Sequence, residues 1–162
     1  MNSNLEMIYT RCSCRAFDQR PVAREDLEAI VKAGQSAPSG MGRRQWHFSV
    51  LTAKDAILEL GQLAYGKLDQ YFYASPAVIL VTYDKDSPFA LQDTGCAMEA
   101  MMLACHALGL GSVWCNAVTR IPSLEGKLGV PAAYRATASL AVGYPKTELA
   151  KRPYPVDNVT FI

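Results

Sequence analysis

Two short strings near the start of the chain combine residue types that suit an anionic ligand. The first has the form R-x-S-x-R and runs Arg11-Cys12-Ser13-Cys14-Arg15, so that two guanidinium groups and one hydroxyl lie within five residues. Arginine supplies forked, permanently charged donors and serine supplies a short one, a set that suits a doubly charged phosphate group. The alternative interpretation is a solvated basic end of a helix.

The second string is a turn-forming segment, which runs Ala37-Pro38-Ser39-Gly40-Met41-Gly42 and is followed by Trp46-His47-Phe48. Proline, serine and glycine favour turns, and a turn of this kind can expose backbone N–H groups to a planar ligand. Taken together at this separation, the two strings indicate a bound group that has both a phosphate and a planar ring.

The sequence contains no Ser/His/Asp set, no paired carboxylates and no metal-ligand spacing. His47 begins an expected strand and His106 lies on an apolar helix, so a hydrogen-bonded structural role is favoured for both. The five cysteines are odd in number, and Cys12 and Cys14 form a C-x-C without a second Cys/His pair at zinc spacing. Free thiols in a reducing compartment are therefore expected, and no metal site.

The composition is that of a chain that folds. Of the 162 residues, 50% are hydrophobic and 19% are charged, and this length leaves room for a single domain, predicted over residues 1–162. The net charge of +1 gives no electrostatic case for nucleic acid or an anionic membrane as the main partner. No signal peptide and no membrane span are visible, so a cytoplasmic protein is expected.

Interleaved helices and strands must position the two strings. Apolar spacing and the positions of glycine and proline predict helices over 5–11, 21–35, 54–63, 93–108 and 122–129, strands over 48–52, 77–83, 111–118 and 136–143, and a possible edge strand over 159–162. This order favours an α/β or α+β layered fold with helices on a four- or five-stranded sheet, and it leaves the strand order open.

The helix expected over 93–108 is apolar around almost its whole circumference. Such a helix should be buried on all sides. The sheet of one domain covers one side, so a second subunit is the simplest cover for the other. Asp93 is the expected N-cap of this helix, and Gly109 is its expected C-terminal stop.

Several segments, in order along nearly the whole chain, resemble the nitroreductase family of FMN-dependent oxidoreductases. The resemblance begins with the two N-terminal strings. It continues with a segment similar to the family's aromatic-x-Ala-Pro segment, with one residue inserted or changed, and with a D-x-G-x-A-M helix start. These and the later matching segments read Phe72-Tyr73-Ala74-Ser75-Pro76, Asp93-Thr94-Gly95-Cys96-Ala97-Met98, Ala107-Leu108-Gly109-Leu110-Gly111-Ser112-Val113-Trp114, Leu128-Gly129-Val130-Pro131 and Leu140-Ala141-Val142-Gly143-Tyr144-Pro145.

The resemblance implies an α+β fold of layered α/β/α type, with a central four- to five-stranded sheet flanked by helices. It also implies a homodimer with the flavin at the subunit interface, the 93–108 helix in the dimer core, and a C-terminal tail that reaches the partner subunit. FMN is the implied cofactor, and NAD(P)H is the implied electron-donating cosubstrate.

The family's pattern implies roles for residues of both strings. Arg11 and Ser13, with the backbone at Cys12, would bind the FMN phosphate. Arg15 would lie near N1 and the C2 carbonyl of the ring, where a cation favours the negative charge of the reduced flavin. The loop residues that would contact the flavin from the other subunit are Pro38, Ser39 and Gly40.

Later residues complete the implied site. The backbone at Cys115 and Asn116 would pass the ring and present an N–H to flavin N5, so no side chain is expected to act as a catalyst. Trp114 is either a core aromatic or a ring contact. Lys151 and Arg152 in the tail would be late phosphate partners, with solvated charges as the alternative.

The chain departs from the family's pattern in the second string. Gly42 stands where the family usually has asparagine, and Arg44-Gln45 stands where it often has Gln-Pro. The usual mid-chain polar flavin contact has no clear counterpart, and Lys67 is a weak candidate. We therefore expect the 38–46 loop to be reshaped and to retain FMN less tightly.

The resemblance implies transfer of electrons from NAD(P)H to a nitroaromatic, quinone or similar small acceptor by a ping-pong hydride mechanism. Two alternatives stay open. One is a flavin dehydrogenase or dehalogenase with a narrow substrate on the same scaffold. The other is a non-enzymatic flavin-binding or ligand-sensing module, which Gly42 and the missing mid-chain contact make credible.

Overall fold

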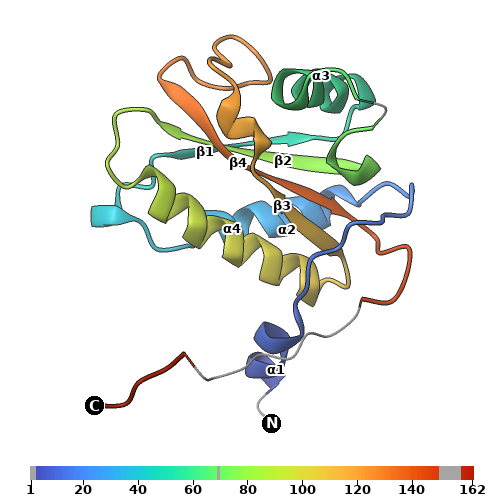
Figure 1. Cartoon of the computed structure of the whole chain (residues 1–162), viewed down its shortest axis with the longest axis vertical. Helices are drawn as coiled ribbons and strands as arrows, with labels where there is room; N and C mark the ends of the chain where they lie inside the picture. The colour runs from blue at the N-terminus through green and yellow to red at the C-terminus, as the bar shows by residue number, and fades with distance from the viewer. Residues whose placement is uncertain (1–2, 69, 150–157) are drawn as a thin grey trace.

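The computed structural model describes residues 3–68, 70–149 and 158–162. Helices and strands are interleaved along the chain (Figure 1). The elements are α1 (Ser3–Thr10), α2 (Arg24–Gln35), β1 (Trp46–Leu51), α3 (Lys54–Tyr65), β2 (Ala77–Asp84), α4 (Ala90–Ala107), β3 (Gly111–Cys115) and β4 (Tyr134–Gly143), with short turns at Gly40–Gly42, Phe72–Ala74 and Ala117–Arg120.

The four strands form one sheet in the order β1-β2-β4-β3, and every neighbouring pair is antiparallel. β2 lies inside the sheet because its side chains are apolar on both faces: every residue from Ala77 to Tyr83 is buried. The expected central strand over 77–83 is thereby confirmed. β1 and β3 are the two edge strands of this sheet.

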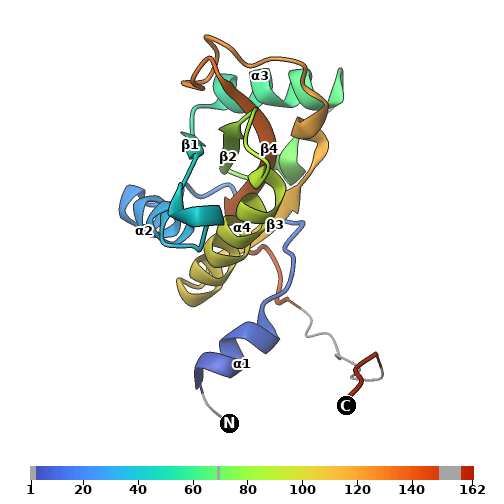
Figure 2. The same cartoon turned by 90° about the vertical axis from the view of Figure 1, so that its left-hand side faces the viewer.

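Helices cover both faces of the sheet (Figures 1 and 2). Because side chains alternate along a strand, Val78 and Leu80 of β2 pack in the cluster that includes Leu60 of α3. Ile79 and Val81 instead pack in the cluster with residues of α2 and α4, such as Met98. The expected α+β class with an α/β/α layering is therefore confirmed.

One protomer covers only one face of α4. Met98 and Met101 are fully buried against the sheet and α2, whereas Leu91 is 66% exposed and Cys96 and Glu99 are also exposed. The expectation of burial on all sides is therefore not met within one chain. Asp93 lies in the first turn of α4 and is not its N-cap, because the helix begins three residues earlier, at Ala90.

The helix α1 projects from the end of the molecule that is remote from α3 (Figures 1 and 2). Two polar contacts join it to α4. Thr10 Oγ1 lies 2.9 Å from His106 Nε2, and Arg11 Nε, just after α1, lies 3.8 Å from Glu99 Oε1. The R-x-S-x-R string therefore follows a helix that contacts the outer side of α4.

Three sequence-based predictions about regular structure were wrong. Residues 122–129 form turns and no helix, because Gly126 (φ +69°), Leu128 (φ +51°) and Gly129 (φ +72°) have left-handed backbones. The strand expected over 111–118 ends at Cys115, where the turn Ala117–Arg120 follows. Residues 159–162 form no edge strand. The sheet among the described residues has four strands, as the expected four- or five-stranded sheet allows.

Candidate functional site

The R-x-S-x-R string runs along the edge of the sheet. The N–H of Cys14 donates to the carbonyl of Ser112 at 2.9 Å, and Ser13 pairs with Ser112 as an isolated parallel bridge. This close approach needs a glycine on β3, since a Cβ at Gly111 would lie 2.6 Å from the Cβ of Cys14. The segment therefore covers β3, which would otherwise be an open edge.

This extended path decides which side chains of the string are presented outward. Cys14 is fully buried in the core, and neighbouring side chains of an extended segment point to opposite sides. Ser13 is therefore directed away from Cys14, and Arg15 is exposed. Arg11 is partly buried and pairs with Glu99. The string thus has one guanidinium group on each side of the Ser13 hydroxyl, a set of donors that suits a phosphate.

Arg15 lies close to the end of β3. Burial raises the pKa of the Cys115 thiol, while a hydrogen bond from Tyr65 and the positive charge of Arg15 act in the opposite direction. The backbone at Cys115 is held by the Oγ of Ser139, which donates to the Cys115 carbonyl at 3.0 Å. Asn116 follows as an exposed residue. The positive charge of Arg15 therefore acts on the end of β3.

The second string lies elsewhere in the protomer. Its turn Gly40–Gly42 sits beside the start of α4, far from the segment that covers β3 (Figure 1). Gly40 is held there by its N–H, which donates to both carboxylate oxygens of Asp93 at 2.9 and 3.1 Å. The Oγ of Ser39 accepts the N–H of Arg44 at 3.0 Å. The two strings therefore do not meet within one chain.

The departures from the family's pattern have a clear geometry. Gly42 has φ +67°, and a Cβ there would meet nothing within 4 Å. Arg44 has φ +50° and is exposed. Lys67 is exposed as well, and Trp114 is 37% exposed on β3. Lys151 and Arg152 lie outside the described residues.

Two buried thiols and His47 have structural surroundings. All five cysteines are free, and burial raises the pKa of Cys14 and raises that of Cys105 to about 12, so both stay as neutral thiols. His47 stacks edge-on to the Tyr134 ring. Among the described residues no group of His, Cys, Asp or Glu could hold a metal ion.

Sequence reasoning missed one buried polar group. Asp93 is 5% exposed and also accepts a short hydrogen bond from the hydroxyl of Tyr83. Burial, with Asp93 as neighbour, raises the pKa of Tyr83 to about 12, so this hydroxyl stays protonated and donates. The only signal in the sequence is the D-x-G helix start, which equally suits an N-cap.

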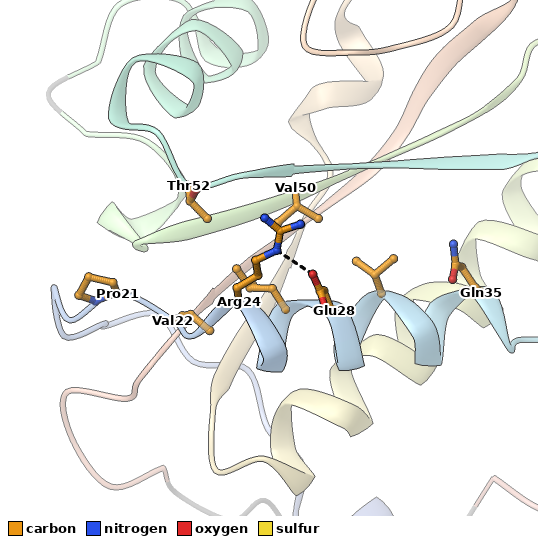
Figure 3. Close-up of a pocket in the computed structure, with 9 residues that line it drawn as sticks. Pro21, Val22, Arg24, Glu28, Gln35, Val50 and Thr52 are labelled. Atoms are coloured by element: carbon orange, nitrogen blue, oxygen red, sulfur yellow. Dashed lines mark hydrogen bonds and ion pairs between the residues drawn. The ribbon is translucent and has the colours of Figure 1, made fainter.

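An apolar groove of about 840 Å³ lies between α2 and the edge strand β1 (Figure 3). Val22 and Val50 face it, and the ion pair between Arg24 Nε and Glu28 Oε1, at 2.7 Å, lies on its rim. None of the residues that the two strings contribute to the candidate site lines this groove.

In the described parts of the chain no helix is long and apolar enough to cross a membrane.

Comparisons with known proteins agree with this arrangement. A relative from Archaeoglobus fulgidus with the provisional name NADH dehydrogenase/NAD(P)H nitroreductase is 33% identical over 156 residues, or 91% of this chain and 88% of the relative. The crystal structure of a nitroreductase with bound FMN from Bacteroides fragilis is 28% identical and superposes with a TM-score of 0.90 over 100% of both chains. A second FMN-bound nitroreductase, from Desulfitobacterium hafniense, is 28% identical and has a TM-score of 0.87 over 100% of this chain and 99% of that one.

The model of the Nitroreductase family matches residues 8–144, a range that begins within α1 and continues past β4. It contains both N-terminal strings, the whole sheet and the end of β3. With the family model, the fold and the relatives in agreement, this chain belongs to the nitroreductase family.

Proposed function

We propose that this chain is an FMN-dependent NAD(P)H oxidoreductase formed by one domain over residues 1–162. One observation carries the proposal: the segment that covers β3 leaves Arg11, Ser13 and Arg15 accessible, while Cys14 between them points into the core. The phosphate of FMN fits the donors at the start of this segment. Its ring fits the end, where Arg15 supplies a positive charge.

Each part of this surface has a separate task. Arg11, which Glu99 already orients, and Ser13 would hold the phosphate, with Lys151 and Arg152 as further cations from the tail. Arg15 would lie against the N1–C2 carbonyl side of the ring, and the backbone at Asn116 would face N5. Bound FMN supplies hydride and electron transfer between NAD(P)H and an acceptor. The protein then needs no nucleophile or general base.

We propose a homodimer in which the partner subunit completes each site. The loop Pro38–Gly40 is held far from the phosphate-binding string of its own chain (Figure 1), which suits contact with the flavin of the other subunit. The exposed side of α4 and the 66% exposed Leu91 offer an interface. Val159 and Phe161 are 54% and 94% exposed, which suits a tail that packs on the partner.

The acceptor that we propose is a nitroaromatic, quinone or similar electron-poor compound, reduced in a ping-pong cycle after NAD(P)H has left. The support for this class is that a relative aligned over 91% of this chain carries the name NADH dehydrogenase/NAD(P)H nitroreductase, and that flavin chemistry needs no acid–base side chain from the protein. The acceptor would then be chosen by shape and reduction potential. A cytoplasmic location, which five free thiols would suit, stays a prediction.

A fluorescence titration with FMN and with riboflavin tests the phosphate site. Wild-type protein should bind FMN far more tightly, because riboflavin lacks the phosphate. Arg11→Ala should weaken FMN binding by about tenfold to a hundredfold, the worth of a hydrogen bond to a charged group. Arg24→Ala is the matched control, since Arg24 is exposed on α2 and pairs with Glu28.

Equal affinities for FMN and riboflavin would contradict the phosphate assignment. Anaerobic titration of the FMN-loaded protein with NADH and then NADPH tests the enzymatic part, and bleaching of the flavin by at least one of them is expected. A flavin that neither nucleotide bleaches would favour a binding or sensing module.

Sedimentation equilibrium tests the dimer. Leu91→Asp on α4 should yield a monomer, whereas the control Leu58→Asp on α3 should leave the dimer intact.

A further inference from the structure

A carboxylate is buried where the second string meets the core. Asp93 is 5% exposed, and no ion pair among the described residues compensates its charge. Its oxygens instead accept the N–H of Gly40, at 2.9 and 3.1 Å, and the hydroxyl of Tyr83. Burial of a charge without such donors is costly. The first turn of α4, where Asp93 lies, adds the favourable end of the helix dipole.

This network joins three elements through one side chain. Tyr83 belongs to β2, Asp93 to α4 and Gly40 to the loop between α2 and β1. On its other side Gly40 is packed against the ring of Phe89, because a Cβ at Gly40 would lie 2.3 Å from Phe89 Cγ. The backbone of Gly40 is therefore clamped between a carboxylate and an aromatic ring.

The clamped loop has little apolar anchoring of its own. Pro38 and Gly42 are exposed, and Met41 is 77% exposed. A buried charge is seldom the most stabilising choice for a core, since apolar residues of similar volume often do as well. Here the carboxylate of Asp93 fixes the position of a backbone N–H, that of Gly40, near the surface. This placement points to a task outside the core.

We propose that Asp93, supported by Tyr83, is a positioning residue that holds Pro38–Gly40 in the geometry needed to contact the flavin of the partner subunit. The inference rests on the proposed function, because it takes these three residues as flavin contacts. A loop that is already ordered loses less entropy when the cofactor binds. Release of the clamp should therefore appear as weaker FMN binding in a protein that still folds.

A neighbouring hydroxyl pair provides a matched control. Thr94 Oγ1 donates to Thr137 Oγ1 at 2.9 Å, and Thr137 Oγ1 donates to the carbonyl of Val81 at 3.1 Å. This pair is as buried as Asp93, bridges α4 to β4 and β2, and does not touch the loop. Thr137→Val should therefore lower stability without a change in cofactor affinity.

The experiment compares Tyr83→Phe, Asp93→Asn, Asp93→Ala and Thr137→Val in the full chain. Urea unfolding measures stability, fluorescence titration measures FMN affinity, and visible circular dichroism of the saturated protein reports the surroundings of the ring. We expect the FMN Kd to rise about tenfold or more in Asp93→Ala, because the acceptor of the Gly40 N–H is lost. The rise should be smaller in Tyr83→Phe, which removes only a donor that orients the carboxylate. Asp93→Asn should fall between wild type and Asp93→Ala, because its amide oxygen can still accept from Gly40.

The flavin dichroism should change in the Asp93 and Tyr83 variants and stay that of wild type in Thr137→Val. If Asp93→Ala does not fold, Asp93→Asn decides, since it keeps the volume of the side chain but leaves one oxygen in place of the two that accept from Gly40. A wild-type Kd and spectrum in every folded Asp93 variant would overturn the inference. So would a rise in Kd in Thr137→Val that matches its loss of stability. Wild-type protein that binds no FMN would instead refute the proposed function itself.

Discussion

In two of the described segments more than one non-glycine residue has a left-handed backbone, and the two segments are stabilised in opposite ways. In the surface loop, Met41 has φ +55° and Arg44 has φ +50°. In the turn before β2, the consecutive residues Phe72, Tyr73 and Ala74 have φ +50°, +57° and +51°. Such backbones cost about 1–2 kcal/mol per residue, so each segment needs contacts that offset the cost.

The loop is held by polar contacts and the turn by aromatic packing. In the loop, Asp93 binds the N–H of Gly40 and Ser39 binds that of Arg44, while the side chains stay exposed. In the turn, Phe72 is 3% exposed, with its ring 5.5 Å from that of Tyr65.

Polar anchoring of the backbone leaves the outer surface of the loop free for a ligand. In the turn, the ring of Phe72 is instead packed into the core. Strained backbone is common at functional sites, and this difference in anchoring agrees with the proposal that the loop contacts the flavin while the turn supports the fold.

The largest effect is expected from removal of the aromatic anchor. Phe72→Ala should lower the free energy of unfolding by about 3–5 kcal/mol, as large-to-small changes in a core do. Tyr73→Ala is the control, because Tyr73 has the same backbone but is 40% exposed, and it should cost about 0.5 kcal/mol or less. Urea unfolding measures both. Equal losses would mean that the turn's backbone, and not the buried ring, provides the stability.

In the loop, the corresponding change should act on the cofactor more than on the fold. Gly40→Ala places a Cβ against the Phe89 ring, and relief of this overlap, worth about 1–3 kcal/mol, should displace the loop. We expect the FMN Kd to rise about tenfold or more, with a smaller loss of stability than in Phe72→Ala. Phe89→Ala in the same chain should restore much of the affinity. Failure of this rescue would place the damage elsewhere.

Ala74→Gly tests whether the left-handed backbone of the turn is strained. Glycine adopts φ +51° without the steric cost of a Cβ, but it also increases the entropy of the unfolded chain. We expect a net gain of about 0.5–1 kcal/mol in the free energy of unfolding. Ala29→Gly, on the exposed side of α2, should lose about 1 kcal/mol. Thermal or urea unfolding that moves both variants in the same direction would show that the turn is not strained.

The smallest effect is expected at Gly42. Asparagine tolerates a backbone of φ +67°, and the space around Gly42 is open, so Gly42→Asn can add a side-chain amide beside the flavin. We expect FMN binding to tighten about twofold to tenfold, the worth of one neutral hydrogen bond. Gly126→Asn, at φ +69° in similarly open space, should leave the Kd unchanged, and so should Arg44→Gln. Weaker binding in Gly42→Asn together with loss of binding in Arg44→Gln would mean that the loop is built around the arginine.

The sequence by itself was sufficient where one segment carries its own signal. The unbroken apolar run of 77–83 predicted a central strand, because only burial on both faces explains it. The spacing of apolar residues predicted α2, α3 and α4 to within a few residues at each end. Arg11, Ser13 and Arg15 predict a phosphate-binding string for the same local reason, since their donors lie within five residues of one another; the titration with FMN and riboflavin tests this prediction.

Tertiary structure decided what depends on distant contacts. From the sequence, Asp93 was predicted to be an N-cap. It is the centre of a buried network only because Gly40, 53 residues away, and Tyr83, 10 residues away, donate hydrogen bonds to it. Residues 122–129, for which the sequence predicted a helix, instead form turns at Gly126 and Gly129, which have left-handed backbones.

The outward direction of Ser13 likewise comes from the pairing with Ser112 across the chain. Periodicity records which face of a segment is buried. It does not record which partner buries that face, because a contact between remote residues leaves no mark on the spacing of either one.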